Sequence, residues 1–304
     1  MPAPLLLHSL EEFEELIGQC LEAAGARSLV EIGSETGAFT RRLLGFVRDR
    51  GGRLTTVEPL PTAELVELAR SDDAFELIEG RSPAALADVG APDAWILDGD
   101  HNYWTVSREL DAALDFADAA RGAPLIFLHD VTWPCARRDF YYDPASIEAD
   151  GLHAHSWTRG VEPGTRTTVD SGLRGDGAFA VACEEGGPRN GILTAIEDVM
   201  QRRGGLRLHV VPAVYGLGVL LRDDAPYADA IEALMTPFTE LPLLARLEEN
   251  RVALYLRVLK LQDELNRATG ARRRVFGAYD QRIADLGTEN AELRMALATA
   301  RATA

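Results

Sequence analysis

Short apolar segments alternate with amphipathic helical segments through the first 130 residues of this chain. The apolar segments cover residues 28–32, 54–57, 75–78, 94–97 and 124–128. Strands and helices that alternate at this spacing form βαβ units, whose strands lie parallel in one sheet. Each segment is mainly apolar, as expected where helices cover both faces of the sheet,. The sequence therefore predicts a doubly wound, mostly parallel α/β sheet of the Rossmann-like kind.

Polar residues and glycines follow the ends of these predicted strands. The first strand leads into Glu31-Ile32-Gly33-Ser34-Glu35-Thr36-Gly37, the second ends in Glu58, the third near Gly80, and the fourth in Asp98. Glycine permits a tight turn and lets a ligand lie against the backbone. The G-x-G-x-x-G turn of dinucleotide-binding enzymes is absent,. The pattern favours a nucleotide-like ligand that lacks a pyrophosphate.

This series of strand ends resembles the class I S-adenosylmethionine-dependent methyltransferases, and the resemblance covers about residues 9–222. It implies that S-adenosyl-L-methionine is the cofactor and that Glu58 accepts hydrogen bonds from both ribose hydroxyls, since a carboxylate can accept two donors at once. The resemblance implies a cofactor site made of Glu31, Gly33, Ser34, Gly37, Glu58, Gly80, Arg81, Ser82 and Asp98.

A second group of polar residues comprises Asp98-Gly99-Asp100-His101 and, after the fifth strand, His129-Asp130. It resembles the metal-dependent O-methyltransferases of the catechol and macrocin types. That resemblance implies that Asp98, His129 and Asp130 bind Mg²⁺ or another divalent cation, with Asp100 as an alternative ligand. His101 is the expected general base and His129 the second choice, because a histidine titrates near neutral pH. Those enzymes often carry an acid where this chain has His129, so catalysis without a metal stays open.

The regular alternation stops after the fifth strand. Residues 131–189 are rich in Gly, Pro, Arg and aromatic side chains, and we expect this insert to form a lid or substrate-binding region,. A helix is predicted over 191–202, followed by strands at 206–211 and 215–221 that form an antiparallel hairpin and give the sheet an antiparallel last strand. We expect a methyltransferase domain over residues 1–225.

Residues 226–304 form a predicted helical, coiled-coil-like tail. Leu247, Leu254 and Leu261 repeat every seven residues. A break is predicted near residues 270–277. After it, a second series repeats at alternating steps of three and four residues: Ile283, Leu286, Asn290, Leu293 and Leu297. Such heptads indicate either a homo-oligomer formed through these helices or a helix that packs on its own domain.

Charge and cysteine content exclude several classes of partner and compartment. The formal net charge of −17 argues against a nucleic-acid partner, which needs a basic surface,. The three cysteines, Cys20, Cys135 and Cys183, show no disulfide or metal spacing, and no apolar run reaches a membrane-spanning length,. We therefore expect a cytoplasmic protein with no membrane association.

The predicted function is methyl transfer to a hydroxyl of a small molecule or of a sugar-containing (glycan) metabolite, assisted by a metal or not. Two alternatives stay open at this point. One is a metal-independent N- or C-methyltransferase with the same fold. The other is a non-catalytic cofactor-binding subunit whose helical tail recruits a partner.

Overall fold

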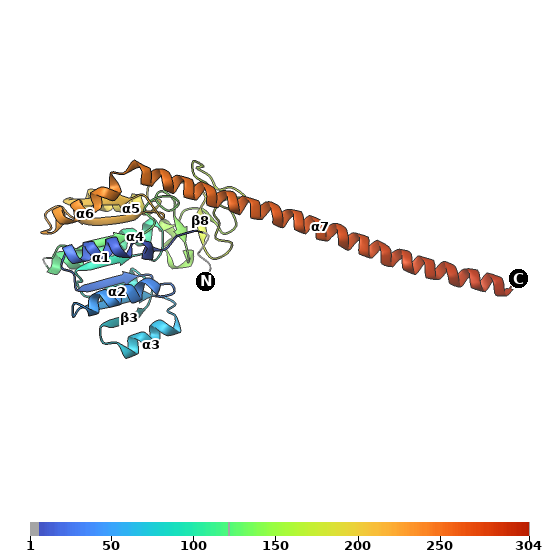
Figure 1. Cartoon of the computed structure of the whole chain (residues 1–304), viewed down its shortest axis with the longest axis horizontal. Helices are drawn as coiled ribbons and strands as arrows, with labels where there is room; N and C mark the ends of the chain where they lie inside the picture. The colour runs from blue at the N-terminus through green and yellow to red at the C-terminus, as the bar shows by residue number, and fades with distance from the viewer. Residues whose placement is uncertain (1–5, 121, 304) are drawn as a thin grey trace. The chain divides into compact units, whose positions relative to one another are not determined.

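The computed structural model describes residues 6–120 and 122–303 (Figure 1). The helices are α1 (Glu14–Ala23), α2 (Ala38–Arg48), α3 (Ala63–Ser71), α4 (Tyr103–Ala120), α5 (Ile192–Arg203), α6 (Ala228–Thr239) and α7 (Pro242–Thr303). The main-sheet strands are β1 (Ser28–Ile32), β2 (Arg53–Glu58), β3 (Phe75–Glu79), β4 (Ala94–Leu97), β5 (Leu125–Leu128), β9 (Leu206–Val211) and β10 (Leu217–Arg222). The chain divides into two compact units, one up to Tyr255 and one from Leu256.

The main sheet has the strand order β3-β2-β1-β4-β5-β10-β9. β1 pairs in parallel with β2 and β4, and β4 pairs in parallel with β5. β10 runs antiparallel to both β5 and β9. The predicted doubly wound, mostly parallel sheet with an antiparallel last strand is therefore confirmed. The order reverses direction between β1 and β4, and in such sheets ligands bind in the crevice beyond the carboxyl ends of the strands at this point.

Two layers of helices cover the sheet and bury its two faces (Figure 1). On one face, α1, α2 and α6 pack on side chains such as Leu29 and Phe127. On the other face, α4 and α5 pack on side chains such as Trp95 and Ile126, which alternate with the first set along the same strands. Trp95 is fully buried and stacks on Phe116 of α4. Both faces are thus largely apolar, which explains why the strands are rich in apolar residues,.

The predicted insert contains a small sheet of its own. β6 (Phe140–Tyr141), β8 (Ala180–Ala182) and β7 (His155–Ser156) pair antiparallel in the order β6-β8-β7. Arg138 is almost completely buried beneath this sheet, and its guanidinium donates to the carbonyl oxygens of Ala182 at 2.6 Å and Arg166 at 2.8 Å. Backbone carbonyls thus compensate much of the cost of burying this cation.

The tail helix α7 is continuous from Pro242 to Thr303, so the predicted break near 270–277 is wrong. A glycine inside a helix costs only about 1 kcal/mol relative to alanine, which neighbouring helix formers can offset. Several apolar side chains are exposed, among them Leu254, Leu261 and Ile283. The side chains at 290, 293 and 297 lie outside the described part of the chain. Within residues 6–120 and 122–303, no helix has an apolar stretch long enough to cross a membrane.

Candidate active site

The turn between β1 and α2 packs against the turn that follows β4. Gly33 has a φ of +85°, and a Cβ on it would lie 2.3 Å from the carbonyl oxygen of Asp98 and 2.7 Å from the Cα of Gly99. The N–H of Gly33 donates to the carbonyl of Val57 at 3.0 Å. Gly37, with a φ of +74°, precedes the first turn of α2. Gly33 therefore allows the ends of β1, β2 and β4 to meet at the switch point of the sheet.

Glu31 is buried at the end of β1. One of its carboxylate oxygens accepts hydrogen bonds from the hydroxyls of Thr40 and Thr56, each at 2.8 Å. Burial raises the pKa of Glu31 to about 7, although the two hydroxyl donors oppose this shift,. Glu31 is thus held in one orientation and changes its charge near neutral pH.

Glu58 ends β2 and holds the turn that Ser34 begins. Its Oε2 accepts from the backbone N–H of Ser34 at 2.9 Å and from the Ser34 hydroxyl at 3.2 Å, while its Oε1 accepts from the N–H of Leu60 at 3.0 Å. A carboxylate has about four acceptor positions, so these donors leave capacity for a ligand. Glu58 therefore organises the turn in addition to facing the cavity described below.

The segment after β3 belongs to the cofactor site that the resemblance implies. Arg81 forms an ion pair with Asp143 of the insert at 3.1 Å. The hydroxyl of Ser82 donates to Glu109 of α4, a buried acid whose pKa rises to about 7 because of its burial. Gly80, Arg81 and Ser82 all line the same cavity as Glu31 and Glu58. The insert and α4 thus fix the conformation of this segment.

The residues after β4 and β5 form one group, here called the acid–histidine cluster: Asp98, His101, His129 and Asp130. His101 lies between the two acids, with Nε2 at 3.3 Å from Asp98 Oδ1 and Nδ1 at 3.2 Å from Asp130 Oδ2. His129 Nδ1 lies 3.1 Å from the same Asp98 oxygen, and its Nε2 lies 3.0 Å from the carbonyl of Val214. The structure therefore brings together four of the five polar residues that the sequence singled out at these two strand ends. The carboxylate of the fifth, Asp100, instead accepts from the side-chain amide of Asn102 at 2.6 Å.

The charges of this cluster stabilise one another. Burial lowers the pKa of both histidines, but the aspartates outweigh it, so the pKa of His101 is raised and that of His129 rises to about 9. Burial raises the pKa of Asp98, but the two histidines hold that pKa well below its usual range. Because both nitrogens of His129 face acceptor oxygens, we assign both as donors. His101 also has both ring nitrogens beside aspartate oxygens, so this criterion does not separate the two histidines as the base.

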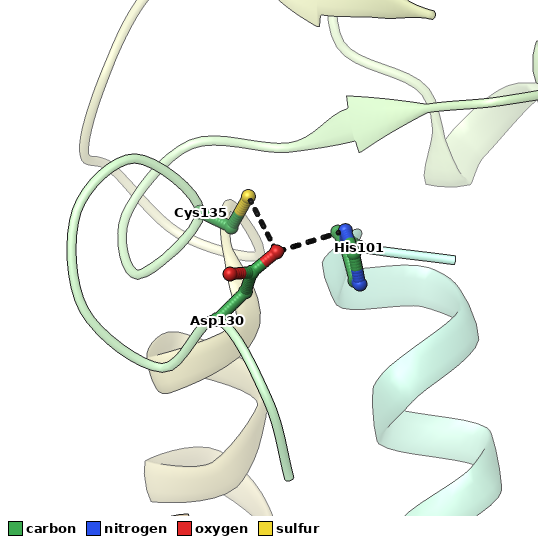
Figure 2. A group of neighbouring side chains, drawn as sticks. All are labelled: His101, Asp130 and Cys135. Atoms are coloured by element: carbon green, nitrogen blue, oxygen red, sulfur yellow. Dashed lines mark hydrogen bonds and ion pairs between the residues drawn. The ribbon is translucent and has the colours of Figure 1, made fainter. Parts of the chain in front are cut away.

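Asp130 and Cys135 lie beside His101 on the other side of the cluster (Figure 2). Asp130 has a φ of +58°, rare for a residue other than glycine,. Its Oδ2 accepts from the buried Cys135 thiol at 4.0 Å. Its Oδ1 is buried and has no hydrogen-bond partner among the described residues. Asp130 therefore offers an unused acceptor atom.

The donor groups in this region do not fit Mg²⁺, which takes oxygen ligands in octahedral geometry. The predicted ligands were Asp98, His129 and Asp130, but the His101 ring bridges the two aspartates and His129 donates to Asp98 and Val214. Ligand atoms of His101, Asp130 and Cys135 do lie within 4.8 Å of one another. Nitrogen and sulfur donors suit borderline transition-metal ions instead.

One cavity of about 1130 Å³ connects these groups. The acid–histidine cluster lines it, and so do all the cofactor residues predicted from the sequence except Gly37. Tyr142 and Phe179 of the insert line it as well. Pockets for one drug-sized ligand measure about 300–1,000 Å³, so this cavity has room for a cofactor and a second molecule.

Several residues that shape the cavity were not found from the sequence. They are Thr40, Thr56, Glu109, Cys135 and Tyr142. Thr56 and Glu109 left a signal: each is a polar residue on the inward face of an element otherwise apolar there. Cys135 and Tyr142 come from the irregular insert, where no periodicity indicates which side chains point inward.

Residues 30–131 match the family model described as "Methyltransferase domain". No curated protein matches the chain. Solved structures of similar fold include an O-methyltransferase from Bacillus cereus in complex with SAH (14% identity, 70% of this chain and 81% of that chain, TM-score 0.43). Another is cofactor-bound Rv0187 from MTB (19% identity, 73% of this chain and 84% of that chain, TM-score 0.42). A third is the O-methyltransferase TomG from Streptomyces achromogenes with SAM (14% identity, 71% of this chain and 82% of that chain, TM-score 0.41). At these identities and TM-scores, the neighbours carry no argument about function.

The matched segment begins in β1 and ends just after β5, so it contains every strand end at which a cofactor residue or a member of the acid–histidine cluster lies. The sheet order, the glycine turn at Gly33 and the acid that ends β2 agree with the resemblance stated from the sequence. Residues 30–131 are therefore similar to a methyltransferase domain, and they lie within a sheet of the predicted order.

Proposed function

We propose that this protein transfers the methyl group of S-adenosylmethionine to a hydroxyl of a small molecule or of a sugar-containing metabolite. The observation that carries the proposal is the position of His101. Its ring borders the cavity that Glu31 and Glu58 also line, and it lies between two carboxylates. A hydroxyl must lose its proton when it is methylated, and a histidine beside the donor supplies the base.

On this proposal the cofactor lies over the carboxyl ends of β1, β2 and β3. Glu31 would take the ammonium of the methionine portion, because ionised Glu31 is a buried anion that needs a cation. The turn of Gly33, Ser34 and Gly37 would lie along the sugar, and Glu58 would accept from one ribose hydroxyl at the acceptor position that its three protein donors leave open,. Gly80, Arg81 and Ser82 would flank the adenine. The sulfonium would then face Asp98 and the acid–histidine cluster.

In the proposed reaction the acceptor hydroxyl replaces Asp130 as the partner of His101 Nδ1. The hydroxyl oxygen attacks the methyl carbon, the bond from carbon to sulfur breaks, and its electrons return to sulfur. The products are a methyl ether and S-adenosylhomocysteine, and the hydroxyl proton ends on His101. Asp98 holds the opposite ring nitrogen and thereby orients the ring. The main contribution of the protein is alignment, because a sulfonium methyl is already activated.

A divalent ion is not needed for these steps. An ion of the borderline class held by His101, Asp130 and Cys135 would occupy the Nδ1 atom that the base requires, so that arrangement competes with the proposed one. The aromatic side chains of Tyr142 and Phe179 favour a ring-containing acceptor, because they offer flat apolar surfaces at the cavity wall,.

The test measures cofactor binding and methyl transfer separately. Calorimetry should show S-adenosylhomocysteine binding, and Glu58→Ala should weaken it at least 10-fold. Transfer of labelled methyl from S-adenosylmethionine would be followed on a panel of catechols and glycosides, with matched aromatic amines as the comparison. Label on the hydroxyl acceptors supports the proposal. Absence of binding at millimolar S-adenosylhomocysteine, or label only on the amines, overturns it.

A further inference from the structure

The loop between β9 and β10, residues 212–216, has an unfavourable backbone conformation. Val214 has a φ of +49° and Tyr215 a φ of +64°. A β-branched residue rarely adopts a positive φ, and such a conformation costs on the order of 1–3 kcal/mol. It persists only where surrounding contacts impose it. The question is therefore which contacts hold this loop.

Glu248, in the second turn of α7, holds the loop by its backbone. Its Oε2 accepts from the N–H of Val214 at 3.1 Å, and its Oε1 accepts from the N–H of Tyr215 at 3.0 Å. The Glu248 side chain is 12% exposed. One carboxylate thus binds two consecutive N–H groups, as an anion does in a backbone nest.

Arg251, one turn further along α7, fixes the Glu248 carboxylate. Its Nε donates to Glu248 Oε2 at 2.6 Å, and its Nη1 donates to the carbonyl of Leu7 at 2.6 Å. Its guanidinium also lies over the Tyr215 ring, 4.7 Å from the ring centroid. The carboxylate is therefore held by an ion pair on one side and by the loop on the other.

The same loop reaches the acid–histidine cluster. The Val214 carbonyl accepts from His129 Nε2 at 3.0 Å, and His129 Nδ1 donates to Asp98 at 3.1 Å. Asp98 in turn contacts His101 at 3.3 Å. An uninterrupted series of hydrogen bonds thus leads from α7 to His101. The peptide unit that joins Val214 to Tyr215 bears two of them, because its N–H (that of Tyr215) binds Glu248 and its carbonyl (that of Val214) binds His129.

We propose that Glu248 is a positioning residue for methyl transfer, and that the base of α7 belongs to the active site through the peptide unit that joins Val214 to Tyr215 and through His129. Glu248 fixes the direction of the Val214 carbonyl, which fixes the His129 ring, which fixes Asp98 behind His101. The proposal rests on the proposed function, since it assigns Glu248 a part in aligning the base. It also gives the C-terminal helix a role beyond packing.

The test compares Glu248→Gln with Glu249→Gln. The neighbour, Glu249, is exposed, and among the residues that the structure describes it pairs only with Arg246 in its own helix, so its variant is the matched control. Glutamine has the same shape as glutamate, but its NH₂ group would face one of the two backbone N–H donors. We expect methyl transfer to fall at least 10-fold in Glu248→Gln, because small misplacements of catalytic groups have large effects on rate. S-adenosylhomocysteine affinity should change less than 2-fold.

A spectroscopic readout separates this role from a merely structural one. In protein labelled with ¹⁵N-histidine, the hydrogen-bonded Nε2–H of His129 should give a protected proton signal, assigned by its loss in His129→Gln. Glu248→Gln should shift or remove that signal, and Glu249→Gln should retain it. An unchanged His129 signal and rate in Glu248→Gln overturn the inference. If the wild type methylates no hydroxyl, the proposed function fails, while the NMR comparison still decides whether Glu248 controls His129.

Discussion

A Cβ atom on Gly33 would lie 2.3 Å from the carbonyl oxygen of Asp98, so the cofactor turn and the acid–histidine cluster are in backbone contact. Gly33 is therefore required for the way β1 and β4 end, whether or not a ligand is bound. Its φ of +85° is a second reason for glycine, because any other residue would be strained at this angle,.

Gly33→Ala should consequently destabilise the protein and weaken cofactor binding together. We expect a loss of about 2 kcal/mol or more in the free energy of unfolding, measured by urea denaturation. Gly45→Ala is the matched control, because Gly45 lies inside α2 and a Cβ there meets nothing within 4 Å. That variant should gain about 0.5–1 kcal/mol. Equal stability of the two variants would contradict the requirement for glycine at position 33.

His101→Gln should reduce methyl transfer by about 10²–10⁴-fold, the usual contribution of a general base. Binding of S-adenosylhomocysteine should stay within a few-fold of wild type, because His101 lies on the acceptor side. The control is His153→Gln, a histidine of the insert whose Nε2 contacts the carbonyl of Arg189. A His101→Gln enzyme with normal turnover would remove His101 from the mechanism.

The pH dependence of the reaction gives a second check on His101. Only the neutral imidazole can accept a proton, so turnover should rise with pH. Burial lowers the pKa of His101, but Asp130 and Asp98 raise that pKa by more than burial lowers it. The midpoint of the rise in turnover should therefore lie above pH 6.5, the ordinary histidine pKa. A rate that falls as pH increases from 6 to 8 would be incompatible with His101 as the base.

The sequence was sufficient to predict the strands and the strand-end residues, because both follow from local pattern. Continuous apolar runs are visible without knowing what packs on them, and the ends of parallel strands meet at one edge of a sheet. That is why Asp98 and His129, 31 residues apart, could be expected to lie together. The pairing of His101 with Asp130 follows from the same logic.

Contacts that depend on long-range packing could not be predicted in this way. Glu248 binds a loop 33 and 34 residues before it, and no spacing in the sequence indicates that contact. Cys135 lies in an irregular segment, so its approach to Asp130 depends on the path of the backbone. The helix break predicted at 270–277 is wrong for a different reason, because single glycines weaken a helix without ending it,.

Cofactor affinity should depend on the ionisation of Glu31. Its pKa is raised to about 7 in the folded protein, chiefly by burial, from an ordinary value of 4.5. Only the ionised carboxylate attracts the ammonium of the methionine portion, so S-adenosylhomocysteine should bind more tightly as pH rises from 6 to 8. Glu31→Gln should abolish that trend. Calorimetry at several pH values measures it, and an equally steep trend in the variant would exclude Glu31 as its source.

The same shift affects stability without ligand. A carboxyl group whose pKa is higher in the folded state favours folding when protonated, so its contribution is lost as pH rises from about 4.5 to about 7,. At pH 8, Glu31→Gln without ligand should therefore be more stable than wild type, by on the order of 1–3 kcal/mol. A variant that is less stable at pH 8 would show that the two threonine hydrogen bonds outweigh the cost of burial.

Methyl transfer should persist after removal of divalent ions. His101 bridges Asp98 and Asp130 in the structure, and the remaining donors near it are nitrogen and sulfur. Activity would be measured after dialysis against EDTA and again after addition of Mg²⁺, Mn²⁺ or Zn²⁺. Loss of activity that Mg²⁺ alone restores would return Asp98, His129 and Asp130 to the role of metal ligands. Restoration by Zn²⁺ in wild type but not in Cys135→Ser would instead identify the cluster in Figure 2 as a metal site.

The exposed apolar side chains of α7 predict self-association through this helix. Leu254, Leu261 and Leu265 are 47–65% exposed, and steps of three or four residues join the seam formed by residues 254, 258, 261 and 265. A long helix with such a seam gains stability when a second copy covers it, because isolated helices are marginal in water. The full chain should therefore be a dimer in solution, measured by light scattering.

The variant Leu261→Arg with Leu265→Arg should convert this dimer to a monomer, since four like charges would face one another in the seam. Asn266→Arg with Ala284→Arg adds the same two charges at exposed positions beside the seam and should leave the dimer intact. A wild-type chain that is monomeric at tens of micromolar would contradict the prediction. So would equal dissociation of both variants, because charge alone would then explain the effect and the heptad seam would have no special part in it.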